Sequence, residues 1–151
     1  MDGLISESSD KFVMVLGATN YPWKLDKAMI RRLEKRIYIP LPDPSTRKQL
    51  FKITLKGVNV VDDLDWDKLV ELTDGYSGSD LTVVVRDAAY MTMRRAIEGK
   101  RGAELRNIPK EEMNKPITQD DFVKAIAKGH GSVRKDDIQA YVNFMNELGS
   151  K

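Results

Sequence analysis

Only two short segments of this chain have the composition of a β-strand, and both lie before Pro42. Residues 12–16 form an apolar, β-branched run, and residues 36–39 form a second run that Pro40 and Pro42 stop. The first run is typical of a strand buried inside a parallel sheet, which needs more neighbours than one strand can supply. We therefore expect residues 1–42 to be an incomplete α/β layer, too small to bury its own core, and the chain to be a fragment.

A short helix is predicted between the two strand candidates. Asp26 can accept hydrogen bonds from the first turn of a helix that runs to Leu33. Asn20 falls at the tip of the first strand, where the apolar run gives way to a loop. Strands without neighbours leave exposed edges, so we expect residues 1–42 to be disordered, rearranged or completed by another chain.

From residue 43 onward the sequence has only helical signals. Several helix starts carry capping patterns, namely Asp43 with Pro44, Asp65 before Trp66, Ser77 with Asp80, and Thr118 with Asp121. Apolar residues follow at helical spacing, and the longest such pattern ends before Gly99 and Gly102. We expect residues 43–151 to form an all-α domain.

The C-terminal third gives two further expectations. Residues 100–115 should be a charged loop with one short helical turn at best. Ser132 should cap a last helix with one continuous apolar stripe, made of Ile138, Tyr141, Val142, Met145 and Leu148. The stripe is an assembly surface or ordinary core, and the sequence alone leaves both possibilities open.

Composition excludes several kinds of chemistry. The 151 residues include no cysteine and one histidine, His130, so disulfides and thiolate metal sites drop out and imidazole catalysis has little support. The net charge of +2 comes from 25 basic and 23 acidic residues mixed along the chain, which favours neither nucleic acid nor a membrane as a partner. Neither a membrane span nor a signal peptide is visible, so a cytosolic or nuclear location is the default expectation.

The segment 13–42 carries the most specific pattern. An apolar run is followed by Ala-Thr-Asn at 18–20, Leu-Asp-x-Ala at 25–28, paired arginines at 31–32 and Pro-Leu-Pro at 40–42. This order resembles the second region of homology of the AAA ATPases. The resemblance implies that residues 1–42 are the C-terminal part of a P-loop AAA α/β subdomain. Residues 43–151 would then be the helical lid subdomain with its C-terminal helix.

The resemblance also implies catalytic roles. Asn20 matches sensor 1, which helps to position the attacking water, and a neutral amide can bond both water and phosphate without adding charge. Taken alone, a Thr-Asn pair is better explained as a turn that bonds its own backbone. Arg31 and Arg32 match arginine fingers that face the nucleotide of an adjacent subunit, although such a charged run is more often a solvated helix end. Ile30 stands where one branch of this family has a further arginine, which leaves the pair intact.

In the lid, residues 75–81 are similar to the sensor 2 segment of this family. Gly78 and Ser79 would let a helix start approach the adenine and ribose, although glycine and serine are common at helix caps without any ligand. Leu50 and Thr54 match positions that contact the base, and an ordinary core role is an equal alternative. We expect no metal ligands in this chain.

Within the family, residues 20–23, 33–40 and 113–122 resemble the microtubule-severing branch of the katanin type. This implies a homo-hexameric ring that uses ATP with Mg²⁺ and acts on microtubules through tubulin tails. It also implies a location in the cytoplasm with the cytoskeleton, at the spindle or centrosome. A regulatory subunit would bind another part of the parent protein. Alternatives are a spastin, fidgetin or ESCRT-disassembly type of AAA ATPase, or a non-enzymatic helical interaction module. The chain has no G-x-x-x-x-G-K-[ST] loop, so we expect it to bind no ATP or ADP alone and to be inactive alone.

Overall fold

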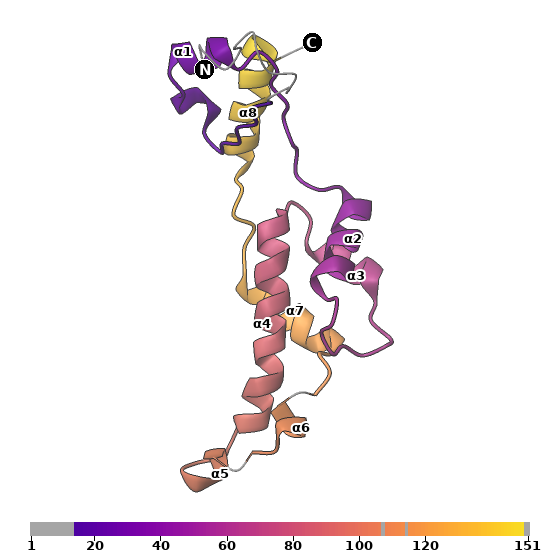
Figure 1. Cartoon of the computed structure of the whole chain (residues 1–151). Helices are drawn as coiled ribbons and strands as arrows, with labels where there is room; N and C mark the ends of the chain where they lie inside the picture. Colours follow the sequence, from indigo (N-terminus) through magenta and orange to yellow (C-terminus); the bar gives the residue numbers. More distant parts are fainter. Residues whose placement is uncertain (1–13, 107, 114, 150–151) are drawn as a thin grey trace. The chain divides into compact units, whose positions relative to one another are not determined.

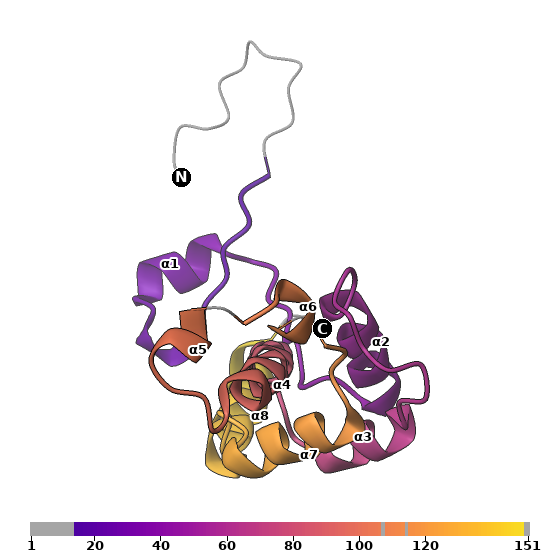
Figure 2. The same cartoon turned by 90° about the horizontal axis from the view of Figure 1, so that it is seen from below.

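The structure, a computed structural model, describes residues 14–149 except 107 and 114. The described chain divides into two compact units. The helical unit comprises residues 40–134, and the terminal unit comprises the described residues up to Ile39 together with those from Lys135 onward. Figures 1 and 2 show that the regular structure in both units is helical. Assignment of residues 1–42 and 43–151 to the two AAA subdomains stays a prediction.

The helical unit is arranged around one long helix. Its elements are α2 (Pro44–Thr54), α3 (Trp66–Leu72), α4 (Gly78–Ile97), α5 (Ala103–Arg106), α6 (Lys110–Met113) and α7 (Gln119–Lys128). Helix α4 contacts α2, α6 and α7, while α3 contacts α2 and α7. In Figure 2, which looks nearly along α4, the helices α2, α3 and α7 lie on one side of it.

The predicted starts of these helices are confirmed. The Asp43 carboxylate accepts a hydrogen bond from the Thr46 N–H at 2.6 Å, with Pro44 in the first helical turn. Helices α4 and α7 begin with reciprocal capping boxes, as their sequence patterns indicated. Gly75 follows α3 with a φ of 76°, a left-handed conformation that glycine adopts without a steric cost.

The core of the helical unit lies between α2, α4 and α7. Phe51 and Phe122 are fully buried, and their ring centroids lie 6.3 Å apart in an edge-to-face arrangement. Leu69 of α3 and Leu81 of α4 are also fully buried in this cluster. Full burial of each such side chain contributes about 1.5–3 kcal/mol, so the core sets how α2 and α7 pack on α4.

The segment 100–115 is more ordered than the sequence indicated. It contains two helices of 4 residues each, α5 and α6, where we expected one short turn at best. Lys100 Nζ lies 2.6 Å from Glu112 Oε2, which ties the start of the segment to α6. The Arg101 N–H donates to Glu104 Oε2 at 3.2 Å at the start of α5, a local contact on which no prediction was based, so the expectation of one turn at best was wrong.

The terminal unit contains a single 3₁₀ turn, η1 (Pro22–Lys24), and the helices α1 (Lys27–Arg32) and α8 (Lys135–Leu148). The start of α1 is as predicted, because Asp26 Oδ1 accepts from the Ala28 and Met29 N–H groups at 2.8 and 2.9 Å. Helix α8 contacts η1, so the last helix packs against a segment more than a hundred residues earlier in the chain.

The two predicted strands do not form among the described residues. Residues 12 and 13 lie outside the described part, and residues 14–16 and 36–39 have no strand pairing. Leu16, Ile37 and Ile39 are 91%, 85% and 85% exposed. A strand is stable only when a partner takes up its backbone hydrogen bonds, and the described chain supplies only one isolated bridge, between Val60 and Ile117.

Candidate functional site

Arg31 and Arg32 form the last turn of α1 and are exposed. Asp26 caps the start of this helix, and the Leu33 N–H closes its end on the Met29 carbonyl at 3.0 Å. A helix of 6 residues capped at both ends places both arginines in one exposed turn. Such groups can bridge phosphate oxygens bidentately, which a lysine ammonium does not do.

Asn20 lies just before η1 and is exposed. The side chain that bonds the backbone of this turn is that of Thr19, whose hydroxyl accepts from the Tyr21 N–H at 3.0 Å. The main-chain carbonyl of Asn20 accepts a hydrogen bond from the Tyr141 hydroxyl of α8 at 2.7 Å. The backbone of Asn20 is therefore held by α8, and its amide group lies at the surface.

Gly78 and Ser79 occupy the first two positions of α4, after the Ser77 cap. The first N–H groups of a helix have no partner within the helix and can bond a ligand. A Cβ on Gly78 would lie 3.7 Å from Leu50 Cδ1, so α2 and the start of α4 are in close contact here. Thr54 is half-buried one turn further along α2, and Leu50 packs against the core.

The sequence-predicted residues fall into two groups. Asn20, Arg31 and Arg32 all lie in the terminal unit, where Asn20 precedes η1 and the two arginines end α1. Leu50, Thr54, Gly78 and Ser79 lie in the helical unit where α2 meets the start of α4. Among the described residues no group of three or more His, Cys, Asp or Glu side chains could hold a metal ion.

Asp80 has a role that sequence reasoning missed in part. Its Oδ2 accepts from the Ser77 N–H and hydroxyl at 2.9 and 2.8 Å, which completes the predicted capping box. The same oxygen accepts from the Ser132 N–H and hydroxyl at 3.2 and 3.1 Å. Ser132 was expected to cap the last helix, but α8 begins only at Lys135, so that prediction is wrong. A hydrogen bond from Ser132 to the charged Asp80 carboxylate is stronger than a neutral capping bond at the start of α8 would be.

Burial of the Asp80 carboxyl raises its pKa, but the hydrogen bonds from Ser77 and Ser132 outweigh burial and hold the pKa below its ordinary value. Because the folded pKa is lowered, these bonds stabilise the fold above pH ~4, near the unfolded pKa, and the stabilisation is lost as pH falls through the folded pKa.

We expect Asp80→Asn to lower the free energy of unfolding by about 1–2 kcal/mol at pH 7, because the charge that holds both the cap and Ser132 is removed. Urea unfolding followed by circular dichroism measures this change. The difference from the unchanged chain should shrink below pH ~4. Asp62→Asn, at an exposed turn, is the matched control. An equal effect of both variants, or a difference that does not begin to shrink as pH falls below ~4, would contradict the assignment.

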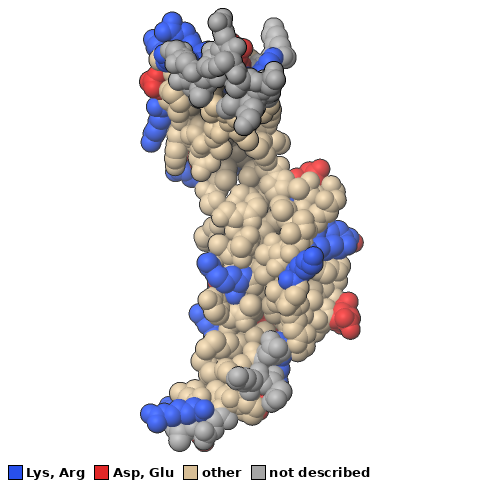
Figure 3. All heavy atoms as spheres, in the orientation of Figure 1, with Lys and Arg blue, Asp and Glu red and all other residues tan. Residues whose placement is uncertain are grey.

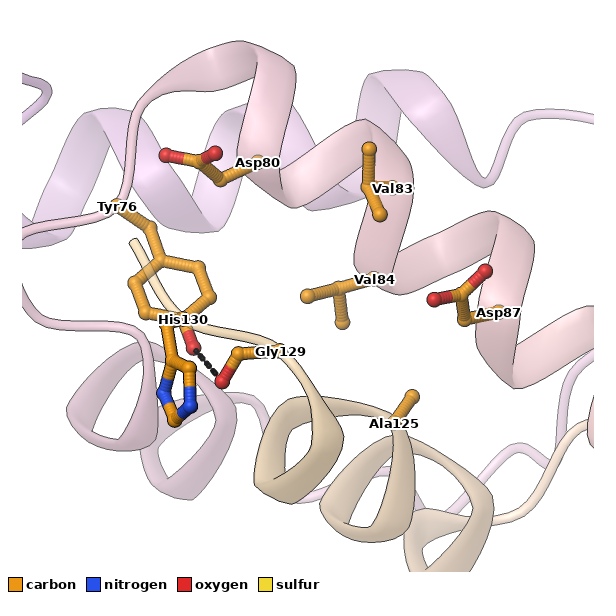
Figure 4. Close-up of a pocket in the computed structure, with 8 residues that line it drawn as sticks. All are labelled: Tyr76, Asp80, Val83, Val84, Asp87, Ala125, Gly129 and His130. Carbon is orange, nitrogen blue, oxygen red and sulfur yellow. Dashed lines mark hydrogen bonds between the residues drawn. The ribbon is translucent and has the colours of Figure 1, made fainter. Parts of the chain in front are cut away.

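A small hollow of about 60 Å³ lies beside this cluster. Figure 4 shows the Tyr76 ring and His130 below the start of α4, with the Tyr76 hydroxyl bonded to the Gly129 carbonyl. The lining residues are Tyr76, Asp80, Val83, Val84, Asp87, Ala125, Gly129 and His130. The hollow has room for a few water molecules and two carboxylates in its wall, so it does not suit a nucleotide.

Three family models match parts of the chain. Residues 1–41 match the ATPase family associated with various cellular activities (AAA), and residues 63–108 match the AAA+ lid domain. The chain belongs to the AAA ATPase family. Residues 90–149, which include α7 and α8, match the Vps4 C terminal oligomerisation domain. The predicted fold class, a remnant of the AAA α/β domain followed by its helical lid, is confirmed, although the two strands do not form among the described residues.

The curated relatives include katanin ATPase subunits. Katanin p60 ATPase-containing subunit A1 of Strongylocentrotus purpuratus is 53% identical over 99% of this chain and 30% of that protein. The A-like 1 subunits of Danio rerio and Homo sapiens are 48% and 46% identical over 96% and 99% of the chain. The predicted resemblance to the katanin type is confirmed. The chain spans about 30% of the length of these relatives.

Solved structures agree with this family. The AAA domain of FIGL-1 in complex with ADP has a TM-score of 0.78 and 33% identity over 91% of this chain and 46% of that one. A structure that addresses the basis of katanin self-assembly has a TM-score of 0.71 and 31% identity over 85% of this chain and 45% of that one. In each case the chain accounts for less than half of the solved domain.

The surface offers no strong charge signal on the face drawn in Figure 3, where Lys, Arg, Asp and Glu occur singly or in small groups among uncharged atoms. None of the helices in the described part of the chain is both long and apolar enough to cross a bilayer.

Proposed function

We propose that this chain is the C-terminal portion of a microtubule-severing AAA ATPase that works as a homo-hexameric ring. The observation that carries the proposal is the 53% identity to a katanin p60 subunit over 99% of the chain. The identity extends across the stretch with Asn20, Arg31 and Arg32 and across the lid. The proposed location is the cytoplasm, with the cytoskeleton, and the proposed substrate is the tubulin of microtubules.

In this ring, Asn20 would orient the water that attacks the γ-phosphate. Arg31 and Arg32 would stabilise the negative charge that develops on a nucleotide held by the adjacent subunit. Both assignments are supported by exposure of the three side chains and by the rigid caps of α1. Phosphoryl transfer depends mainly on such positioning and charge stabilisation, and a finger contributes about 10³–10⁵ in rate.

The start of α4 suits one side of a nucleotide. Gly78 keeps the backbone approachable, the N–H groups of Gly78 and Ser79 face outward from the helix start, and Leu50 offers an apolar edge. ATP supplies the phosphoanhydride bond whose hydrolysis drives the ring. The Mg²⁺ that accompanies ATP, and the phosphates, would be held by the phosphate-binding loop of a complete AAA domain. We therefore propose that the chain alone neither binds nucleotide tightly nor hydrolyses it.

Self-assembly is the proposed use of the C-terminal region. The match of residues 90–149 to an oligomerisation domain and the likeness to a structure concerned with katanin self-assembly support this proposal. A fidgetin-like activity is the second candidate, because the AAA domain of FIGL-1 has a TM-score of 0.78. Its 33% identity is well below the 53% of the katanin relative, so we favour the katanin activity.

A chimera tests the proposal. This chain replaces the matching region of the Strongylocentrotus purpuratus katanin subunit, and ATP hydrolysis and severing of fluorescent microtubules are measured beside the unchanged katanin. We expect both activities to stay within about tenfold, because the residues that act on nucleotide and neighbour are supplied in full. A folded, hexameric chimera without ATPase activity would refute the ATPase assignment, and ATPase activity without severing would refute the katanin type.

A further inference from the structure

Tyr141 lies at the centre of an aromatic cluster that joins α8 to the rest of the terminal unit. Its ring centroid lies 5.2 Å from that of Trp23 in η1 and 5.8 Å from that of Tyr38, with the Tyr38 ring stacked at 24°. Its hydroxyl donates to the Asn20 carbonyl at 2.7 Å. One side chain of α8 therefore contacts the residue proposed as sensor 1 and both segments that flank α1.

The hydroxyl of Tyr141 is a permanent donor. Desolvation, with a smaller contribution from Asp137, raises its pKa above the ordinary value. The group therefore stays protonated across the physiological range, and its bond to Asn20 does not depend on pH.

Arg36 forms a second link, between the C-terminal ends of two helices. Its guanidinium donates through Nη2 to the carbonyl of Ile30 in the last turn of α1, and through Nη1 to the carbonyl of Leu148 at the end of α8. The last carbonyls of a helix have no partner within it, and a cation at this end is also favoured by the helix dipole. A planar guanidinium can hold two carbonyls in a fixed relation, whereas an ammonium acts as a point charge.

We propose that α8 sets the positions of Asn20 and of the Arg31–Arg32 turn, with Tyr141 and Arg36 as the positioning residues. The proposal rests on the function proposed above for Asn20, Arg31 and Arg32. In this arrangement the C-terminal helix affects hydrolysis in its own subunit through Asn20 and in the neighbouring subunit through Arg31 and Arg32. It does not change the affinity for nucleotide. Any event that lifts α8, such as a change at a subunit boundary, would then slow hydrolysis without emptying the site.

Misplacement by about 1 Å of a group that acts on the reacting atoms costs on the order of a hundredfold in rate. Removal of the Tyr141 hydroxyl frees the Asn20 carbonyl but keeps the aromatic stack. We therefore expect Tyr141→Phe to lower kcat of the katanin chimera by about ten- to a hundredfold with KM for ATP unchanged. Arg36→Lys should act in the same way.

The matched controls are Tyr90→Phe, at a 53% exposed tyrosine of α4, and Arg86→Lys, at a 61% exposed arginine of the same helix. Both lie in the helical unit and should leave kcat within twofold. A general loss of stability would lower the fraction of active enzyme and so the apparent kcat, but it would also lower the melting temperature, which the positioning role leaves nearly unchanged. A kcat within twofold for Tyr141→Phe and Arg36→Lys would overturn the proposal.

A second measurement uses this chain without katanin. Amide NMR signals of Asn20 and its neighbours should shift on Tyr141→Phe, and those of the Ile30–Arg32 turn should shift on Arg36→Lys, whereas neither set should move on Tyr90→Phe. Unchanged signals would overturn the positioning role whatever the chimera does. If these signals shift but the unmodified chimera has no ATPase activity, the proposed function fails and the link from α8 to Asn20 and α1 stands.

Discussion

Phe122→Ala should strongly destabilise the helical unit. Phe122 is fully buried on α7, with its ring 6.3 Å from that of Phe51 on α2, so truncation leaves a cavity between two helices. Such a change costs about 3–5 kcal/mol against a typical domain stability of about 5–15 kcal/mol. For a unit of this size we expect the melting temperature to fall by roughly 12 °C or more. Circular dichroism of the whole chain measures it.

The control for this change is Ile53→Ala, because Ile53 lies on α2 and is 69% exposed. That variant should change the free energy of unfolding by no more than about 0.5 kcal/mol. Similar melting temperatures for Phe122→Ala and the unchanged chain would show that the described core does not hold α2, α4 and α7 together.

Arg31→Ala and Arg32→Ala should each abolish most ATP hydrolysis in the katanin chimera while leaving nucleotide binding intact. The finger stabilises charge that appears only in the transition state, so its loss lowers kcat, by about 10³–10⁵ for a complete finger, and leaves the dissociation constant for a fluorescent ATP analogue nearly unchanged. Lysine at either position should rescue little, since it lacks the planar fork of donors.

Lys35→Ala provides the control for the arginine variants, because Lys35 is an exposed cation close to α1 in the sequence. It should keep hydrolysis within about twofold. Full activity in both arginine variants would contradict the finger assignment. If Lys35→Ala lowers hydrolysis as much as the arginine variants do, the loss reflects the positive charge of this segment in general and not a finger.

The helices could be predicted because their signals are local. The Asp43 cap and the capping boxes of Ser77 and Thr118 each lie within four residues of the helix they start, and the structure has all three. The two segments of strand-like composition do not pair among the described residues, which agrees with the expectation that residues 1–42 lack the neighbours a strand needs. In the segment 36–39, Ile37 and Ile39 are exposed, and Arg36 and Tyr38 are half-buried.

The contacts of α8 and of Ser132 could not be predicted, because they join residues that are far apart in the sequence. Ser132 bonds Asp80 across 52 positions, and Tyr141 bonds Asn20 across 121 positions. The apolar stripe on α8 predicted that the helix docks on something, but the identity of its neighbour is set by the fold. Arg36, expected at the start of a strand, links the ends of α1 and α8 for the same reason.

The candidate site came from resemblance to a family and not from the chemistry of single residues. Nothing local distinguishes Asn20 from a turn asparagine or Arg31 and Arg32 from a solvated helix end. The structure adds that Thr19 accepts the hydrogen bond of the turn and that Asp26 caps α1. It also adds that Tyr141 of α8 bonds the Asn20 carbonyl. Their catalytic roles stay predictions.

A mixing experiment tests most directly whether this chain acts on a neighbour's nucleotide. Chimera subunits carrying both Arg31→Ala and Arg32→Ala are mixed with katanin subunits whose own site binds ATP without hydrolysing it, and ATP hydrolysis is measured. We predict that the mixture regains hydrolysis well above the sum of the two inactive preparations, because an intact katanin finger faces an intact chimera site wherever the two kinds of subunit are neighbours. Hydrolysis no greater than that sum, in rings shown to contain both subunits, would contradict action between subunits.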